Sequence, residues 1–213
     1  MIGLLGKKVG MTTIFTDDGR RVPVTVLEAG PCKVVQVKSP ENDGYAAIQL
    51  GYEPIKPKKA NKPLLGHFKK AGTEPFRKLK EFTVEDVSEK FEIGQEIKAS
   101  DIFKEGELVD CTGVSKGKGF QGVVRRHKFG GGPKTHGQAD KFRAPGSIGA
   151  SSFPSRVVKG IRMAGHMGNR TVTVRGLKIM KILKDDNIIL VKGTIAGPKG
   201  GYVVIRRSKK KAK

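Results

Sequence analysis

The chain has 213 residues, and its 42 lysines and arginines against 20 acidic residues give a formal net charge of +22. A charge of this size favours an anionic partner, namely nucleic acid, an anionic membrane surface or an acidic protein. No apolar run approaches the roughly 18 residues that cross a bilayer, and the apolar start Met1–Leu5 is too short for a secretory signal. The sequence therefore disfavours a membrane partner and export.

Short strands are predicted in the first fifty-odd residues. Residues 9–16 and 20–28 flank the turn Asp17-Asp18-Gly19, which is a good hairpin signal, and valines alternate along the second strand. Two more strands are predicted over residues 32–38 and 45–51. Repeated short strands with tight turns are typical of a small barrel rather than of a parallel sheet.

An acid-rich region follows after a break in this pattern at Ile55–Lys59. A short helix is predicted within residues 61–71. Residues 73–107 then contain ten acidic residues, half of the total, against six basic ones. We interpret residues 57–100 as an insertion on the outer face, where the acidic residues would repel an anionic partner.

The second half of the chain returns to strands on either side of a segment without hydrophobic periodicity. A short basic helix is predicted over residues 121–127. Strands are predicted over residues 107–114, 171–183, 187–192 and 202–206. The last eight residues, 206–213, carry six basic groups and no acid.

Residues 125–170, which we call the glycine-rich finger, have the composition of a segment that cannot form its own core. Only seven of these 46 residues are Leu, Ile, Val or Phe, below the roughly one-fifth that a folded chain needs. Ten are Lys or Arg, and Asp140 is the single acid. Glycine lets the backbone approach a surface closely, and arginine guanidinium groups bind phosphates in a bidentate manner. We expect the finger to be held by an anionic partner.

Folded RNA is the partner that the finger suits best. A thin irregular segment fits the cavities of folded RNA better than a groove of duplex DNA, and no helix-turn-helix or zinc-finger motif is present. Four apolar side chains are candidates to wedge against bases or sugars: Phe129, Phe142, Phe153 and Met163.

An alternative is a nucleotide-binding enzyme, because Gly117–Gly122 matches the pattern G-x-G-x-x-G. The apolar parallel strand that a dinucleotide fold needs is missing before Asp140, and the loop does not match a triphosphate-binding loop either. The four histidines lack metal-site spacing, and no nucleophile and base are paired. Cys32 and Cys111 have no C-x-x-C partner, and we predict two buried reduced thiols in a reducing cytoplasm. The sequence predicts no catalysis, no metal and no cofactor.

Several long motifs resemble one family of ribosomal proteins. They are IGLLGKKVGMT at residues 2–12, SKGKGFQG at 115–122, THG at 135–137, PGSIG at 145–149 and MAGHMG at 163–168. The chain resembles, from end to end, the bacterial members of the family of large-subunit ribosomal protein three. Some members have a methylated glutamine directly after Gly-Ser-Ile-Gly. This chain has Ala150 there, so that modification is excluded.

The resemblance implies both a fold and a function. The fold is mainly β, with a six-stranded barrel like that of the elongation factors, a small α+β insertion and a long extended loop that penetrates RNA. The function is that of a structural constituent of the large ribosomal subunit in the cytoplasm. The implied partners are 23S ribosomal RNA, near its 3′ end and early in assembly, and neighbouring ribosomal proteins, with the loop reaching toward the peptidyl transferase centre. No membrane or small-molecule substrate is implied.

The residues expected to contact RNA are basic and lie in or next to the glycine-rich finger. The candidates are Lys116, Lys118, Arg125, Arg126, Lys128, Lys134, His136, Lys141, Arg143, Arg156, Lys159, Arg162, His166 and Arg170. The chain is predicted to divide into five segments. They are the first part of the barrel (1–56), the acid-rich insertion (57–100), the second part of the barrel (101–124), the glycine-rich finger (125–170) and the last part of the barrel with the basic tail (171–213).

Overall fold

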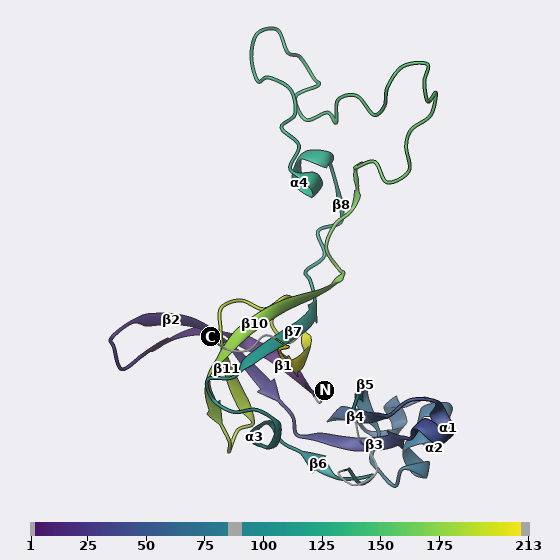
Figure 1. Ribbon diagram of the computed structural model, residues 1–213, viewed down its shortest axis with the longest axis vertical. Coiled ribbons are helices and arrows are strands. Elements are labelled where there is room, and N and C mark those ends of the chain that lie inside the picture. Colours follow the sequence, from purple (N-terminus) through teal and green to yellow (C-terminus); the bar gives the residue numbers. More distant parts are fainter. Residues whose placement is uncertain (1–2, 85–90, 210–213) are drawn as a thin grey trace. The chain divides into compact units, whose positions relative to one another are not determined.

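The computed structural model describes residues 3–84 and 91–209 (Figure 1). The chain divides into two compact units. Unit 1 comprises Met1–Val114 and Thr171–Lys213, and unit 2 comprises Ser115–Arg170. Within the described ranges, no helix is long and apolar enough to cross a membrane.

Unit 1 contains a closed barrel of six antiparallel strands in the order β1-β12-β7-β10-β11-β2. The strands are β1 (Gly3–Phe15), β2 (Arg21–Ala29), β7 (Leu108–Val114), β10 (Thr171–Leu183), β11 (Ile188–Lys192) and β12 (Tyr202–Arg207). Closure gives every strand a neighbour on both sides, so the barrel wall has no open edge. The prediction of a mainly β fold with a six-stranded barrel is confirmed.

Side chains of the barrel strands alternate between the interior and the surface, because successive residues of a strand point to opposite faces. Val203 and Ile205 of β12 are buried, and so are Val109 and Cys111 of β7. Both cysteines are free and buried, as predicted. Burial raises the pKa of the Cys32 and Cys111 thiols to about 12, so both stay protonated and unreactive at neutral pH.

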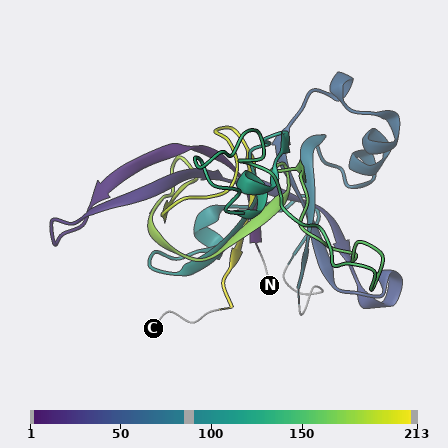
Figure 2. The ribbon, with the colours of Figure 1, turned by 90° about the horizontal axis from the view of Figure 1, so that it is seen from above.

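The β1–β2 hairpin continues beyond the rest of the barrel wall (Figures 1 and 2). β12 pairs with Gly3–Lys7 of β1, and β11 pairs with Val24–Glu28 of β2, whereas β1 and β2 pair with each other as far as Phe15 and Arg21. The end of the hairpin is therefore a two-stranded ribbon. The predicted turn closes it, with Gly19 at a φ of 72°.

A second sheet of unit 1 has the strand order β5-β4-β3-β6. Its strands are β3 (Cys32–Lys38), β4 (Ala47–Pro54), β5 (Phe76–Thr83) and β6 (Glu96–Ile97). Four short helices accompany it: α1 (Pro40–Asp43), the 3-10 helix η1 (Pro57–Lys59), α2 (Lys62–Lys70) and α3 (Ala99–Ile102). Phe68 of α2 packs on Val35 and Phe76, which attaches the helix to the sheet.

The interpretation of residues 32–38 and 45–51 as barrel strands was wrong. These residues form β3 and β4, which pair with each other and with β6 and β5 instead of with the barrel. Gly30, at a φ of 83°, turns the chain out of the barrel before β3 begins. A period of two residues identifies a strand and its faces, but it does not identify the neighbouring strand.

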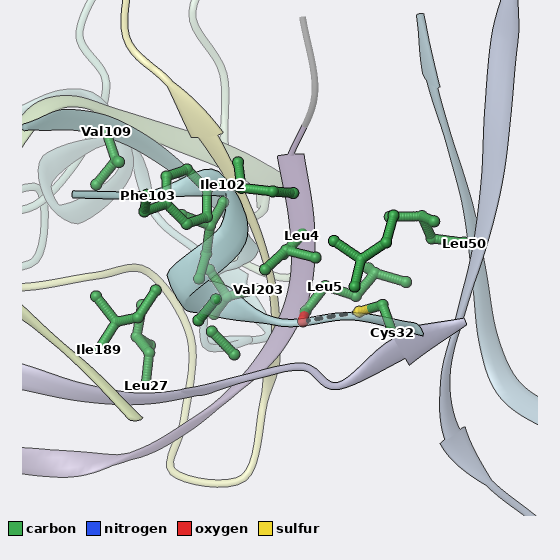
Figure 3. Packing of buried hydrophobic residues seen from close by; sticks show 14 of the residues in the cluster. Leu4, Leu5, Leu27, Cys32, Leu50, Ile102, Phe103, Val109, Ile189 and Val203 are labelled. Atoms are coloured by element: carbon green, nitrogen blue, oxygen red, sulfur yellow. Dashed lines mark hydrogen bonds between the residues drawn. The ribbon is translucent and has the colours of Figure 1, made fainter. Parts of the chain in front are cut away.

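The barrel and the second sheet share one hydrophobic core. Figure 3 shows Leu5 of β1 next to Cys32 of β3 and Leu50 of β4, and the Cys32 thiol donates a hydrogen bond to the Leu5 carbonyl at 3.5 Å. Phe103, directly after α3, is buried in the same cluster, together with Ile189 of β11. The second sheet is therefore packed against the barrel and is not an independent domain.

Candidate nucleic-acid interface

Unit 2 has little regular structure. Its elements are the strands β8 (Phe120–Gln121) and β9 (Gly165–His166) and the helix α4 (Val123–His127). The two strands pair with each other. The segments at the two ends of unit 2, residues 115–118 and 167–170, also run antiparallel to each other; we call them the arms of unit 2. Lys118 donates its amide hydrogen to the Met167 carbonyl at 2.9 Å, and Ser115 donates to Arg170 at 2.9 Å. The rest of unit 2 is turns and irregular backbone.

Two glycines of unit 2 are required by close backbone packing. Gly168 has a φ of 76°, and a Cβ atom there would collide with the Lys116 carbonyl. Gly131 has a φ of 75°, and its Cβ would collide with the Phe142 carbonyl, which also accepts a hydrogen bond from the Gly132 amide at 2.9 Å. Part of the glycine content therefore allows the chain to pack on itself, which the composition of the segment did not predict.

Thirteen of the fourteen candidate RNA-binding residues have exposed side chains, and Arg126 is half-buried. None of the fourteen forms an ion pair within residues 3–84 and 91–209. Lys134 lies 5.7 Å from the centre of the Phe142 ring, in a cation–π contact. The positive charges of unit 2 are therefore not compensated by the described carboxylates.

Arg126 has a structural contact that the sequence did not reveal. Its guanidinium group donates a hydrogen bond to the Met163 carbonyl at 2.7 Å, and His127 Nε2 lies 3.0 Å from the same oxygen. Arg125 instead donates a hydrogen bond to the side-chain oxygen of Gln121, four residues earlier, at 3.2 Å. Arg126 therefore connects α4 to Met163, two residues before β9, whereas Arg125 remains exposed.

The apolar side chains of unit 2 differ in their exposure. Phe153 and Met163 are exposed, with 87% and 41% of their surface accessible, whereas Phe129 and Phe142 are half-buried. Phe120 is 76% exposed as well. It is not among the predicted wedge residues, because it lies before the glycine-rich finger to which that prediction was limited. Of the four predicted wedge residues, Phe153 and Met163 have the most surface free for a partner.

The G-x-G-x-x-G pattern does not have the surroundings of a dinucleotide site. β8 has two residues and its partner β9 is antiparallel, whereas the dinucleotide fold needs a parallel sheet. α4 has only five residues. Gly119 instead has a φ of 66° and accepts the Met167 amide hydrogen at 3.0 Å. No group of three His, Cys, Asp or Glu residues that could hold a metal occurs in the described part of the chain.

These features define a class of protein: an antiparallel barrel that carries a basic, largely irregular unit with exposed aromatic side chains. A sequence model of the family described as Ribosomal protein L3 matches residues 78–187. The chain is also similar to proteins named large ribosomal subunit protein uL3. It is 53% identical over 209 residues to that of Chloroherpeton thalassium, with 98% of this chain and 100% of the relative covered.

Two further relatives carry the same name. The identity is 56% over 209 residues for the protein of Solibacter usitatus, covering 98% of this chain and 99% of the relative. It is 50% over 208 residues for that of Acidothermus cellulolyticus, covering 98% and 93%. The chain belongs to the ribosomal protein L3 family.

Membership of the family confirms the resemblance found in the sequence. The chain is a protein of the large ribosomal subunit and is not an enzyme. Its location is the ribosome, which is cytoplasmic in bacteria.

Proposed function

We propose that the chain binds 23S ribosomal RNA near its 3′ end, helps to initiate assembly of the large subunit and supports the peptidyl transferase centre with the glycine-rich finger. Neighbouring ribosomal proteins are proposed as further partners. The five-segment division of the chain also stays a prediction, apart from the two strands corrected above.

One observation carries this proposal: the 56 residues of unit 2 contain a single buried side chain, that of Val123. Ordering the backbone costs about 1–2 kcal/mol per residue, whereas burying one valine contributes only about 1.5–3 kcal/mol. Hydrophobic burial within unit 2 therefore cannot stabilise its conformation. An external partner has to supply the missing contacts.

The charge of unit 2 indicates what that partner is. Twelve lysines and arginines face one acid, Asp140, in residues 115–170. Phosphates compensate such charges, and lysine and arginine contacts to them dominate the affinity for nucleic acids. The exposed Phe153 and Phe120 rings supply surfaces on which unpaired bases of RNA can stack. We propose all fourteen candidates as RNA contacts, with Arg126 also holding α4 in place.

The test compares two variants that lose the same charge. In the first, Lys134→Gln, Arg143→Gln and Arg156→Gln remove three exposed cations of unit 2. In the control, Lys58→Gln, Lys69→Gln and Lys70→Gln remove three exposed cations near and in α2. Binding of 23S RNA transcribed in vitro is measured at several salt concentrations.

Three phosphate contacts at about 0.7–0.9 each predict that the log–log salt slope becomes shallower by about 2.1–2.7 in the unit 2 variant. The control should keep a slope close to that of the unchanged protein. Equal effects of the two variants would show that RNA responds only to total charge, which contradicts a specific role for unit 2.

A further inference from the structure

A groove with a volume of about 750 Å³ lies on the barrel of unit 1. It crosses the outer face of three neighbouring strands, β12, β7 and β10. Thr112 of β7, Thr173 and Arg175 of β10, and Arg206 of β12 line it. We call it the barrel groove. None of its residues belongs to the fourteen candidates in unit 2, so the proposed contacts of unit 2 leave it without a role.

The strand register brings hydroxyl groups and cations together in the barrel groove. Thr112 lies opposite Thr173, and their Oγ1 atoms are 2.8 Å apart. On the next outward-facing row, Arg206 lies opposite Asp110. Arg175 follows Thr173 by two residues, at a bulge in the pairing of β10 with β7. Bulges bend a strand and redirect side chains, and they are common next to binding sites.

Asp110 is the one carboxylate among the described lining residues, and it already has a partner. Its Oδ1 atom accepts a hydrogen bond from the Gly176 amide at 2.8 Å, inside the bulge. Arg207 is likewise committed, because its Nε atom lies 3.0 Å from Glu107 and its guanidinium group donates to the Ile102 carbonyl. Asp110 keeps its charge but forms no ion pair with the other cations of the described lining, and Arg207 is less available to a ligand.

Three exposed cations of the barrel groove are left for a ligand. Arg175, Arg206 and Lys209 form no ion pair within the ranges that the structure describes. The Arg206 guanidinium lies 5.4 Å from the centre of the buried Phe82 ring. This cation–π contact holds the arginine at the groove without neutralising its charge, so less conformational freedom is lost when a ligand binds.

We propose that the barrel groove binds phosphates of the RNA backbone and gives the barrel an RNA contact of its own. The inference rests on the proposed function, because it takes ribosomal RNA as the partner. Arginine guanidinium groups donate charge-assisted hydrogen bonds to phosphate oxygens. The hydroxyls of Thr112 and Thr173 line the same groove. Because one of them donates to the other, the pair keeps one hydroxyl hydrogen for a phosphate oxygen. Such contacts hold a backbone in place without reading its sequence.

The lining favours a nucleic-acid backbone over the other anionic partners. A protein partner needs apolar or aromatic anchors that enter pockets, but the described lining is threonine, arginine, serine, lysine and aspartate, with Val84 as its only apolar residue. A free nucleotide would need a surface on which its base can stack. No aromatic residue is among the described lining, and the Phe82 ring that the Arg206 guanidinium contacts is fully buried.

The test uses the full chain with Arg175→Gln and Arg206→Gln. The control is Lys181→Gln with Lys192→Gln, two exposed cations on barrel strands outside the groove. Binding of 23S RNA transcribed in vitro is measured between low and high salt. Two lost contacts predict a slope shallower by about 1.4–1.8 for the groove variant, with affinity at least about tenfold weaker at fixed salt. The control should change affinity by less than about threefold.

A second variant, Thr112→Val with Thr173→Val, removes both hydroxyls and preserves charge and shape. This variant should bind 23S RNA about threefold more weakly, with an unchanged salt slope. If the arginine variant does not fold, the threonine variant alone tests the proposal. Hydroxyl-radical footprinting should show that the groove variants lose protection of an RNA segment that the unit 2 variant still protects.

Two results would overturn the proposal, and a third would overturn the function on which it rests. The groove variants could leave affinity, salt slope and footprint unchanged while the unit 2 variant weakens binding. This result would refute RNA binding at the barrel groove and leave the proposed function intact. Unchanged binding to free RNA with poor incorporation into subunits would make the groove a protein-docking surface. Failure of the unaltered chain to prefer 23S RNA over unrelated RNA would instead refute the proposed function itself.

Discussion

Deletion of the outer part of unit 2 separates RNA binding from the stability of the barrel. The deletion removes residues 130–162 and joins Phe129 to Met163 through a short Gly-Ser linker. This design keeps the β8–β9 pair and the Met163 carbonyl, which accepts the hydrogen bond from Arg126. None of the deleted residues is buried. The free energy of unfolding should therefore change by less than about 1 kcal/mol, because almost no apolar surface returns to water.

The same deletion removes six lysines and arginines and one acid. If each cation contacts a phosphate, the salt slope of RNA binding should become shallower by about 4.2–5.4, at about 0.7–0.9 per contact. RNA around the missing segment would lose a positively charged filler, so we expect late large-subunit precursors to accumulate or peptide-bond formation to slow.

Thermal unfolding and subunit profiling measure both effects. A shift of about 1 kcal/mol corresponds to about 2–4 °C for a chain of this size. The melting temperature should therefore stay within about 4 °C of the unchanged protein, while assembly or peptide-bond formation fails. A larger drop in melting temperature, or normal subunits made at normal yield, would refute this reasoning.

Four further changes test individual contacts. The Tyr202 hydroxyl, helped by nearby cations, holds the pKa of the Glu53 carboxyl below its ordinary value. Glu53 therefore stabilises the fold above about pH 4.3 and loses this effect as the pH falls through its folded pKa, so Glu53→Gln should reduce the difference in melting temperature between pH 7 and pH 3. Leu50→Ala should destabilise the fold by about 2–5 kcal/mol, and urea unfolding should remain a single transition because the sheet and the barrel share a core. Gly168→Ala places a side chain where φ is 76° and where the Lys116 carbonyl blocks it. The strain of at least about 1–2 kcal/mol should weaken RNA binding and alter the RNA footprint. The melting temperature of the barrel should stay unchanged. His136→Ala should slow peptide-bond formation far less than the deletion does; complete inactivation with normal assembly would indicate chemistry at this residue.

Most strands of the barrel were accessible from the sequence because they carry an alternating pattern and turn signals. The first strand was predicted only from residue 9, but β1 begins at Gly3, and its first residues, Gly3–Lys7, pair with β12. Gly3–Gly6 are all buried, so they show no alternation. Valines alternate in β2, and Asp17-Asp18-Gly19 marks the turn of the first hairpin. The assignment of β3 and β4 to a second sheet was not accessible. Their pairing is decided by contacts such as Leu5 with Leu50 in the shared core, which join residues far apart in the sequence.

The composition of the glycine-rich finger indicated correctly that it has almost no core, because burial depends directly on apolar content. The internal contact of Arg126 was hidden, since it depends on the carbonyl of Met163, 37 positions away. The barrel groove was hidden for the same reason. Thr112 and Thr173 are 61 positions apart and meet only through the register of β7 and β10.

The measurement that tests the central claim most directly is ultraviolet crosslinking of this protein to RNA in cells, followed by sequencing of the RNA and mass spectrometry of the attached peptides. The claim predicts fragments of 23S RNA from near its 3′ end and around the peptidyl transferase centre, joined mainly to peptides from residues 115–170. Crosslinks spread over unrelated RNAs, or confined to peptides outside residues 115–170, would contradict it.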